Sequence, residues 1–286
     1  MTDFSQVFYW ETLPLRGARC RLDEIYARVL RDFKGQDDMA QLLGEALVGL
    51  ALLATTQKNY ERLIIQAQSK GPLKLLVAEM TAAGGMRAYG DWEEGVSVDL
   101  SHLPDALLAI TVDMGMDRER YQGLVELRES LTLSLNAYFA ESVQSPAYFR
   151  LVADPQRQQA GGYFLQRLPG VLAAEDWELA TQFIAIGSDQ SLLQAKPEQF
   201  LPEIFPDSAV RLHTPQALFF SCSCSPEKVE RMLISLGQTE AEETLQSEGE
   251  IVVTCEYCQE VYRFGEEEVA LMLSLIHISE PTRLGM

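Results

Sequence analysis

Apolar side chains recur at helical spacing in two stretches near the beginning of the chain. Residues 22–33 predict an amphipathic helix, and residues 39–57 predict a second, longer one. Gly44 and Gly49 lie inside the second helix, where glycine lowers the intrinsic helix propensity. We therefore expect this helix to pack closely against a neighbouring element.

The next part of the chain has a pattern typical of short strands. Arg62–Gln68 and Leu73–Met80 flank Lys70-Gly71-Pro72, a turn signal that favours an antiparallel pair. Further strands are predicted at 86–90, 107–112, 121–127, 147–153 and within 160–170, with a helix over 130–143. Gly84-Gly85 and Gly161-Gly162 are interpreted as turns, not phosphate-binding loops. Strands and helices do not alternate regularly, so the sequence predicts an α+β fold whose N-terminal mixed α/β domain has antiparallel sheets.

Residues 176–218 show short apolar pieces that prolines interrupt. A helix is predicted from about Glu175 and ends at Gly187, whereas Pro197, Pro202 and Pro206 divide the remainder into short segments. We interpret this stretch as a metastable linker of short helices, because segmented and moderately apolar structure is only marginally stable.

The last part of the pattern predicts a small C-terminal domain over 219–273. Ser225-Pro226 is a good helix start, and Gly237 ends that helix. A second helix, two strands and a final helix are predicted at 239–245, 250–254, 261–264 and 265–273. The domains are therefore 1–175, 176–218 and 219–273. Residues 274–286 match no pattern, so they are interpreted as a non-native tail and left out of the fold argument.

Composition narrows the classes of function. The 286 residues carry a net charge of −19, which disfavours binding to nucleic acid. No apolar run reaches the ~20 residues of a membrane-spanning helix, and no membrane partner is expected. The N-terminus lacks an apolar secretory signal, which favours a reducing cytoplasmic location. The three histidines are scattered and no catalytic motif is present, so we do not expect an enzyme.

Four of the five cysteines form two close pairs, Cys222 with Cys224 and Cys255 with Cys258. Two such pairs can offer four thiolates to one tetrahedral metal ion, and a Cys₄ set is a standard site for Zn²⁺. The spacing leaves three interpretations open: a static structural zinc site, an oxidation sensor, or disulfides in a secreted protein. Cys20 stands apart and is interpreted as an ordinary thiol.

The cysteine region resembles the 33 kDa heat-shock chaperonin family, the redox-regulated holdases of bacteria. The resemblance is carried by Phe220-Ser221-Cys222-Ser223-Cys224-Ser225 and by Gly249-Glu250-Ile251-Val252-Val253-Thr254-Cys255-Glu256-Tyr257-Cys258. Three further blocks match in order: Leu43-Gly44-Glu45-Ala46-Leu47, Arg120-Tyr121-Gln122-Gly123 and residues 160–170.

This resemblance implies an N-terminal substrate-binding domain, a metastable linker and a C-terminal zinc domain that acts as a redox switch. It implies one Zn²⁺ on the four cysteines in the reduced, inactive state. Oxidation would form Cys222–Cys224 and Cys255–Cys258 disulfides, release zinc and unfold the linker. The exposed surface would then hold unfolding or oxidatively damaged client proteins without ATP, as a homodimer.

Two alternatives have their own sequence arguments. A thiol–disulfide oxidoreductase could use Cys255 and Cys258, although that motif usually lies near a strand–helix–strand unit. A zinc-dependent nucleic-acid adaptor is disfavoured by the charge of the cysteine region, because the stretch from Cys222 to Met272 contains twelve glutamates and only three basic residues.

Overall fold

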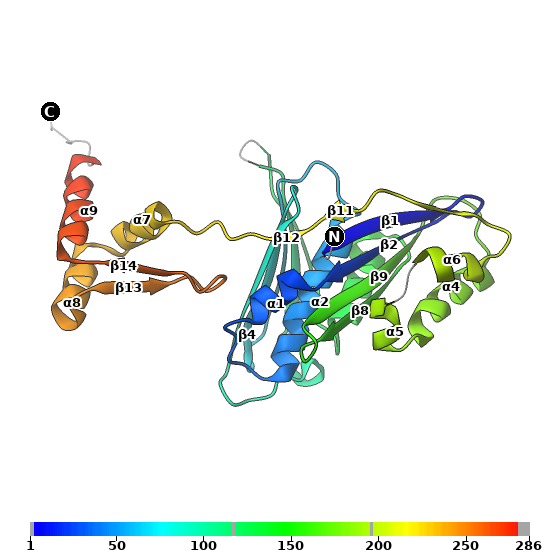
Figure 1. The fold of residues 1–286 in the computed structure, drawn as a ribbon, viewed down its shortest axis with the longest axis horizontal. Coiled ribbons are helices and arrows are strands. Elements are labelled where there is room, and N and C mark those ends of the chain that lie inside the picture. Colours follow the sequence, from blue (N-terminus) through cyan, green and yellow to red (C-terminus); the bar gives the residue numbers. More distant parts are fainter. Residues whose placement is uncertain (1–2, 116–117, 195–196, 280–286) are drawn as a thin grey trace. The chain divides into compact units, whose positions relative to one another are not determined.

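The computed structural model describes residues 3–115, 118–194 and 197–279. The chain divides into two compact units, Met1–Ser221 and Cys222–Met286 (Figure 1). Each unit has its own apolar core.

The first sheet joins the beginning of the first unit to its end. Its strand order is β10-β1-β2-β9-β8, all pairs are antiparallel, and β11 also pairs with β1. The strands are β1 (Phe4–Trp10), β2 (Leu15–Leu22), β8 (Ala147–Asp154), β9 (Gln159–Arg167), β10 (Val210–Leu212) and β11 (Gln216–Ala217). The sequence analysis predicted β8 and β9 but assigned nothing to residues 4–21, and it placed Leu22, the last residue of β2, in a helix. The alternation of large apolar and polar residues in β2 is weak, because its buried positions include the small residues Gly17, Ala18 and Cys20.

The second sheet contains the strands that the sequence pattern predicted most clearly. Its order is β12-β5-β4-β3-β6-β7, antiparallel except for the parallel pair β12–β5. The strands are β3 (Arg62–Gln68), β4 (Leu73–Thr81), β5 (Gly85–Trp92), β6 (Leu107–Asp113), β7 (Tyr121–Glu126) and β12 (Phe219–Phe220). The predicted antiparallel pair around Lys70-Gly71-Pro72 is confirmed as β3–β4.

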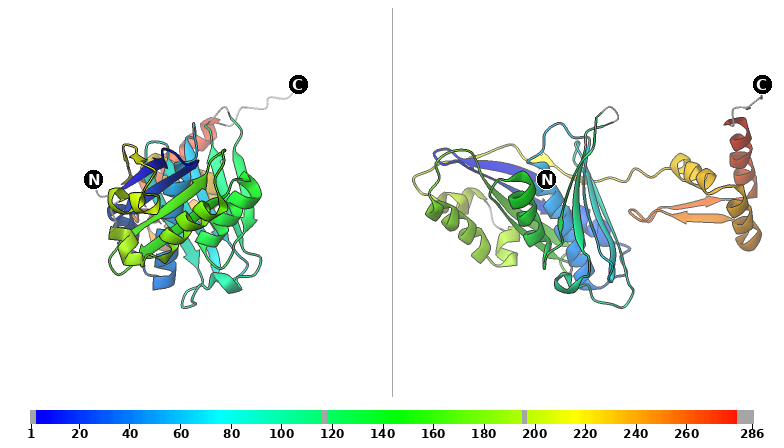
Figure 2. Two further views of the ribbon diagram at one scale, coloured as in Figure 1. Left: turned by 90° about the vertical axis from the view of Figure 1, so that its right-hand side faces the viewer. Right: turned by 180° about the vertical axis from the view of Figure 1, so that it is seen from behind.

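Helix α2 (Asp37–Ala54) lies between the two sheets and is buried on nearly all sides (Figures 1 and 2). A helix that is apolar all round belongs in such a position. The predicted close packing is confirmed: a Cβ on Gly44 would lie 2.6 Å from Ala153 Cβ, and one on Gly49 would lie 2.8 Å from Leu135 Cδ1. Helix α1 (Glu24–Leu30) precedes α2.

The helix predicted over residues 130–143 is confirmed, with a change of winding near its end. Ser130 caps α3 (Leu131–Tyr138), because its Oγ accepts a hydrogen bond from the backbone N–H of Leu133 at 3.2 Å. The chain continues as a π-helical turn, η2 (Phe139–Val143). A 3-10 turn, η1 (Leu100–His102), lies earlier in the chain.

Three short helices cover the face of the first sheet that points away from α2 (Figure 2). These covering helices are α4 (Ala174–Ile186), α5 (Asp189–Gln194) and α6 (Pro197–Ile204). The two faces of β9 separate cleanly, since Tyr163 and Leu165 join the core under the covering helices while Phe164 joins the core around α2.

Two parts of the sequence interpretation are corrected here. Residues 210–217 form the strands β10 and β11 and not short helices, because they extend along the open edge of β1. Gly161 and Gly162 lie in the middle of β9 and not in a turn. A Cβ on Gly162 would be 2.3 Å from the carbonyl oxygen of Arg150, so glycine is needed for strand contact. Gly84, by contrast, has a φ of +96° in a turn, as predicted.

The second unit has the helices and strands expected for 219–273. They are α7 (Pro226–Leu236), α8 (Gln238–Glu248), β13 (Ile251–Thr254), β14 (Val261–Phe264) and α9 (Glu266–Ser279), with β13 and β14 antiparallel. Its buried apolar core is small, consisting of Val229, Leu233, Ala241, Ile251, Phe264, Val269 and Met272. A core of this size needs an additional source of stability. The α+β class is confirmed; the non-native origin of 274–286 stays a prediction.

Candidate metal centre

Two loops of the second unit carry the four paired cysteines. Cys222 and Cys224 lie in the extended segment before α7, and Cys255 and Cys258 lie in the turn between β13 and β14. Cys20 is buried in the first sheet, where it pairs with Gly162 of β9. The structure therefore places Cys20 as an ordinary core residue.

The β13–β14 turn is closed by backbone hydrogen bonds. The N–H of Cys255 donates to the carbonyl oxygen of Glu260 at 2.9 Å, and the N–H of Gln259 donates back to the carbonyl oxygen of Cys255 at 2.8 Å. Gln259 adopts a left-handed φ of 58°, which lets the chain reverse within this short loop. The turn fixes both of its thiols at one end of the hairpin.

The first cysteine pair is anchored to the start of α7. Ser225 Oγ accepts a hydrogen bond from the N–H of Lys228 at 3.4 Å, and Pro226 occupies the first turn. The Lys228 ammonium donates to the carbonyl oxygen of Ser223, the residue between the two cysteines. Lys228 and the start of α7 therefore hold the loop that carries Cys222 and Cys224 in place.

All four sulfur atoms come together with the separation of a metal site. They lie within 4.8 Å of one another. Cys222 Sγ is 3.7 Å from Cys255 Sγ, and Cys224 Sγ is 3.3 Å from Cys258 Sγ. Metal–sulfur bonds of about 2.3 Å in a tetrahedron put sulfurs about 3.8 Å apart, so the four thiols fit one metal ion without rearrangement of the loops.

Burial makes two of the four thiols reluctant to ionise in the absence of a cation. It raises the pKa of Cys255, and it raises the pKa of the buried Cys258 well above its ordinary value. Tyr262 on β14 hydrogen bonds to Cys224, which raises the pKa of the tyrosine hydroxyl. A metal ion would therefore have to displace protons from this cluster as it binds.

Lys228 and Tyr262 are residues that the sequence analysis did not single out. Each acts on the cysteine pair that precedes α7, and neither belongs to a recognisable metal-binding motif. A signal for Lys228 exists in the sequence, since a lysine in the first turn of a helix begun by Ser225-Pro226 can reach back over the preceding loop.

No second cluster of metal-ligating side chains occurs within residues 3–115, 118–194 and 197–279. His213, one of the three scattered histidines, is exposed, and its ring packs against Tyr9 with 5.2 Å between centroids. In the same described part of the chain, no helix has the length and apolarity to cross a membrane.

Comparison with known proteins agrees with this geometry. The model of the Hsp33 protein family matches residues 3–265. This chain belongs to the Hsp33 family. It is 37% identical to the 33 kDa chaperonin of Azotobacter vinelandii over 95% of both chains, and 36% identical to that of Ectopseudomonas mendocina over 96% of both.

The fold is also shared with a solved member of the Hsp33 family. The crystal structure of the 33 kDa chaperonin (heat shock protein 33 homologue) of Thermotoga maritima matches with a TM-score of 0.79. The matched region covers 96% of this chain and 99% of the Thermotoga maritima chain, and the two sequences are 24% identical.

Membership of the Hsp33 family makes this chain a chaperone with a metal-binding cluster of four cysteines, and not an enzyme. The oxidoreductase alternative is therefore not supported. The turn that holds Cys255 and Cys258 joins two antiparallel strands, unlike the strand–helix–strand setting of thioredoxin-like motifs.

Proposed function

We propose that this protein is a redox-regulated, ATP-independent holdase of the bacterial cytoplasm. In the reduced, inactive state, one Zn²⁺ is bound by Cys222, Cys224, Cys255 and Cys258. Oxidation of the cysteines releases the zinc and uncovers a surface that binds unfolded or oxidatively damaged proteins. The cluster of four sulfur atoms within 4.8 Å is the observation that carries this proposal.

Zinc is the metal that this ligand set favours. Four thiolates at tetrahedral separation are typical of structural zinc sites, whereas magnesium and calcium prefer oxygen ligands. The apolar core of the second unit is small, so metal binding supplies a large part of its folding free energy. In isolated zinc peptides this contribution is about 10–16 kcal/mol.

Oxidation converts the ligands into groups that no longer bind zinc. A peroxide molecule takes two electrons from one pair of thiols, which forms a disulfide and two molecules of water, so two peroxides oxidise the site. The proposed disulfides, Cys222–Cys224 and Cys255–Cys258, rest on the family resemblance. Two sulfur contacts join the two loops, at 3.7 Å and 3.3 Å, which suits a shared metal ion.

The covering helices conceal the apolar surface that would bind clients. Ile184 and Leu201 are buried against Trp10 and Leu165 of the first sheet. The Trp10 ring makes an edge-to-face contact with Phe205. The buried indole N–H of Trp10 has no hydrogen-bond partner in the described part of the chain. Because an unsatisfied buried donor costs free energy, this indole lowers the stability of the covering. Its release would expose apolar surface for clients and for a homodimer.

Light scattering from a chemically unfolded client tests the proposal. The zinc-loaded, reduced protein is compared with the same protein after peroxide treatment at mildly elevated temperature. We expect only the oxidised form to suppress aggregation. Equal suppression by both forms would show a constitutive chaperone with a static metal site.

Peptide mapping by mass spectrometry tests the pairing separately. Digestion of the oxidised protein should give one peptide with a Cys222–Cys224 disulfide and another with a Cys255–Cys258 disulfide. Peptides from the two loops that are linked by a disulfide would contradict the proposed pairing. Cys20 is the internal control, because this buried core thiol should remain unmodified in the folded protein.

A further inference from the structure

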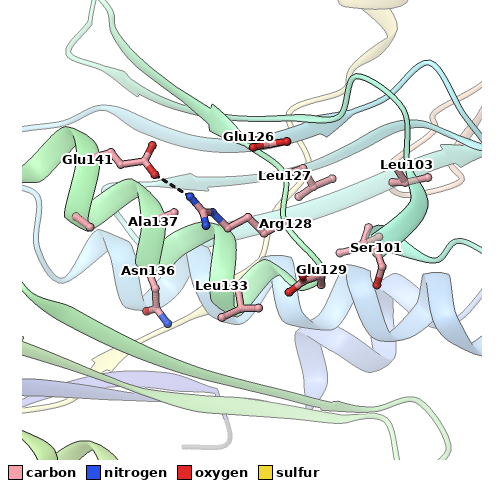
Figure 3. A pocket seen from close by; sticks show the side chains of 12 residues that line it. Ser101, Leu103, Glu126, Leu127, Arg128, Glu129, Leu133, Asn136, Ala137 and Glu141 are labelled. Carbon is pink, nitrogen blue, oxygen red and sulfur yellow. Dashed lines mark hydrogen bonds and ion pairs between the residues drawn. The ribbon is translucent and has the colours of Figure 1, made fainter.

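The first unit contains an open groove of about 690 Å³ between η1, the end of β7 and α3 (Figure 3). The buried side chains Leu100, Leu127 and Ala137 form its apolar part. Leu133 lines it from α3 and keeps 43% of its surface exposed. A small apolar side chain of a ligand would find contacts here.

The charged side chains around the groove are mainly acidic. Glu126, Glu129 and Glu141 line it together with a single base, Arg128. Arg128 is neutralised by Glu141, since its Nη2 lies 2.8 Å from Glu141 Oε1, the contact dashed in Figure 3. Within the described residues Glu126 and Glu129 are exposed and form no ion pair. The groove therefore presents two uncompensated negative charges beside apolar surface.

The walls of the groove are held in place by hydrogen bonds. Ser134 is fully buried, and its Oγ accepts from the backbone N–H of Arg128 at 2.9 Å while donating to the carbonyl oxygen of Ser130 at 2.8 Å. The π-helical turn η2 brings Ala140 to the groove. A preformed site pays little ordering entropy when a ligand binds.

We propose that this groove binds a short segment of an unfolded protein in which lysine or arginine neighbours an apolar side chain. Charge complementarity selects this occupant, because the basic group would meet Glu126 and Glu129 while the apolar group meets Leu133. A second copy of this chain is a poor occupant of this acidic groove, since acidic residues outnumber basic ones 42 to 23 in each copy. The homodimer of the proposed function would instead use the apolar surface under the covering helices. The inference rests on the proposed function, in that the segment belongs to a client.

The groove differs from the covered face of the first sheet in its accessibility. None of its lining residues belongs to the core beneath the covering helices. Short basic segments should therefore bind to the reduced, zinc-loaded protein as well as to the oxidised one, although only the oxidised form is expected to suppress aggregation. This site would add selectivity for cationic clients to the redox-controlled surface.

Fluorescence anisotropy with a fluorescein-labelled octapeptide of alternating leucine and lysine tests the inference. The peptide is titrated with reduced, zinc-loaded protein at low salt. We expect saturable binding that weakens as salt is added, because exposed charges are screened. An octapeptide of alternating leucine and glutamate should bind at least about tenfold more weakly.

Two variants locate the site by independent means. Glu126→Gln combined with Glu129→Gln removes the charge and should weaken binding at least about fivefold. Ala140→Trp fills the groove from an exposed position and should weaken binding without changing charge. Glu93→Gln combined with Glu94→Gln removes two exposed charges elsewhere in the first unit and should leave the affinity unchanged.

Three results would overturn the inference: no binding of the lysine peptide, equal binding of the glutamate peptide, or unchanged affinity in both groove variants. The light-scattering comparison reports on a different property, the gain of holdase activity upon oxidation. Failure of the redox switch and failure of the groove are thus separate outcomes.

Discussion

Asp3 shows how much a single buried side chain can organise. Its Oδ1 accepts from the backbone N–H of Asp23 at 2.8 Å and of Glu24 at 3.0 Å, and its Oδ2 accepts from that of Ile25 at 2.6 Å. Its own carbonyl oxygen accepts from Leu218 at 3.0 Å. Asp3, the residue just before β1, therefore caps α1 and also holds the chain just before β12.

Replacing Asp3 by alanine should destabilise the first unit by about 1–3 kcal/mol, because three backbone N–H groups, that of the buried Ile25 among them, lose their acceptor. Urea unfolding followed by circular dichroism measures this change. Glu94→Ala, at an exposed position, is the control and should change the free energy of unfolding little. Equal stability of both variants would show that water replaces the carboxylate.

The buried thiols make metal binding depend on pH. Burial raises the pKa of Cys255 and of Cys258, so these groups hold protons near neutral pH when no metal is bound. Binding must displace those protons, and apparent zinc affinity should fall as pH falls from about 8 to about 6, up to about tenfold per pH unit for each displaced proton. Competition with a chelator whose own pH dependence is known measures the apparent zinc affinity at each pH. A flat affinity over this range would contradict protonated thiols.

At the scale of elements, β9 shows why composition can mislead. Two consecutive glycines are typical of a turn, yet Gly161 and Gly162 lie in a central strand. The reason is the closeness of the neighbouring strands: a Cβ at Gly161 would be 2.7 Å from the carbonyl oxygen of Cys20. Only the packing of the sheet reveals this requirement.

Gly162→Ala should therefore destabilise the first unit strongly, by roughly 2 kcal/mol or more, because the added carbon meets both Arg150 backbone and Val48. Thermal unfolding provides the measurement. Gly265→Ala is a suitable control, since nothing lies within 4 Å of its new carbon. A Gly162→Ala protein with unchanged melting temperature would show that the strands can move apart.

At the scale of the whole molecule, the proposed function requires the covering helices to come away from the first sheet. Ile184 and Ile186 lie on the same helix, α4, yet Ile184 is 1% exposed and Ile186 is 81% exposed. The first belongs to the apolar core over the first sheet and the second does not. The same substitution at these two isoleucines therefore distinguishes the effect of lost packing from the effect of the changed residue type.

Ile184→Ser should loosen the covering helices, because a buried apolar side chain is replaced by a polar one at a cost of roughly 2–5 kcal/mol. We expect faster proteolysis near α4 and partial suppression of client aggregation by the reduced protein. Ile186→Ser should behave like the unmodified protein in both assays. If Ile184→Ser remained inactive when reduced, despite faster proteolysis, this surface would not be the client site.

The sequence by itself determined the elements with strong periodicity and the metal centre. The helix α2, the strands β3 and β4 and the hairpin around Cys255 are local patterns, and the two short cysteine pairs supply the number and type of ligands that a metal site needs. Such signals depend on neighbours in the chain, so no knowledge of the fold is required.

Only the tertiary structure decided the arrangements that join distant residues. The pairing of β1 with β10, the capping of α1 by Asp3 and the acidic groove beside Leu133 each combine segments far apart in the sequence. Their energies come from burial and from hydrogen bonds that exist only after the chain has folded. The physical reason is that a sequence pattern records which face of an element is apolar, but not which partner will cover it.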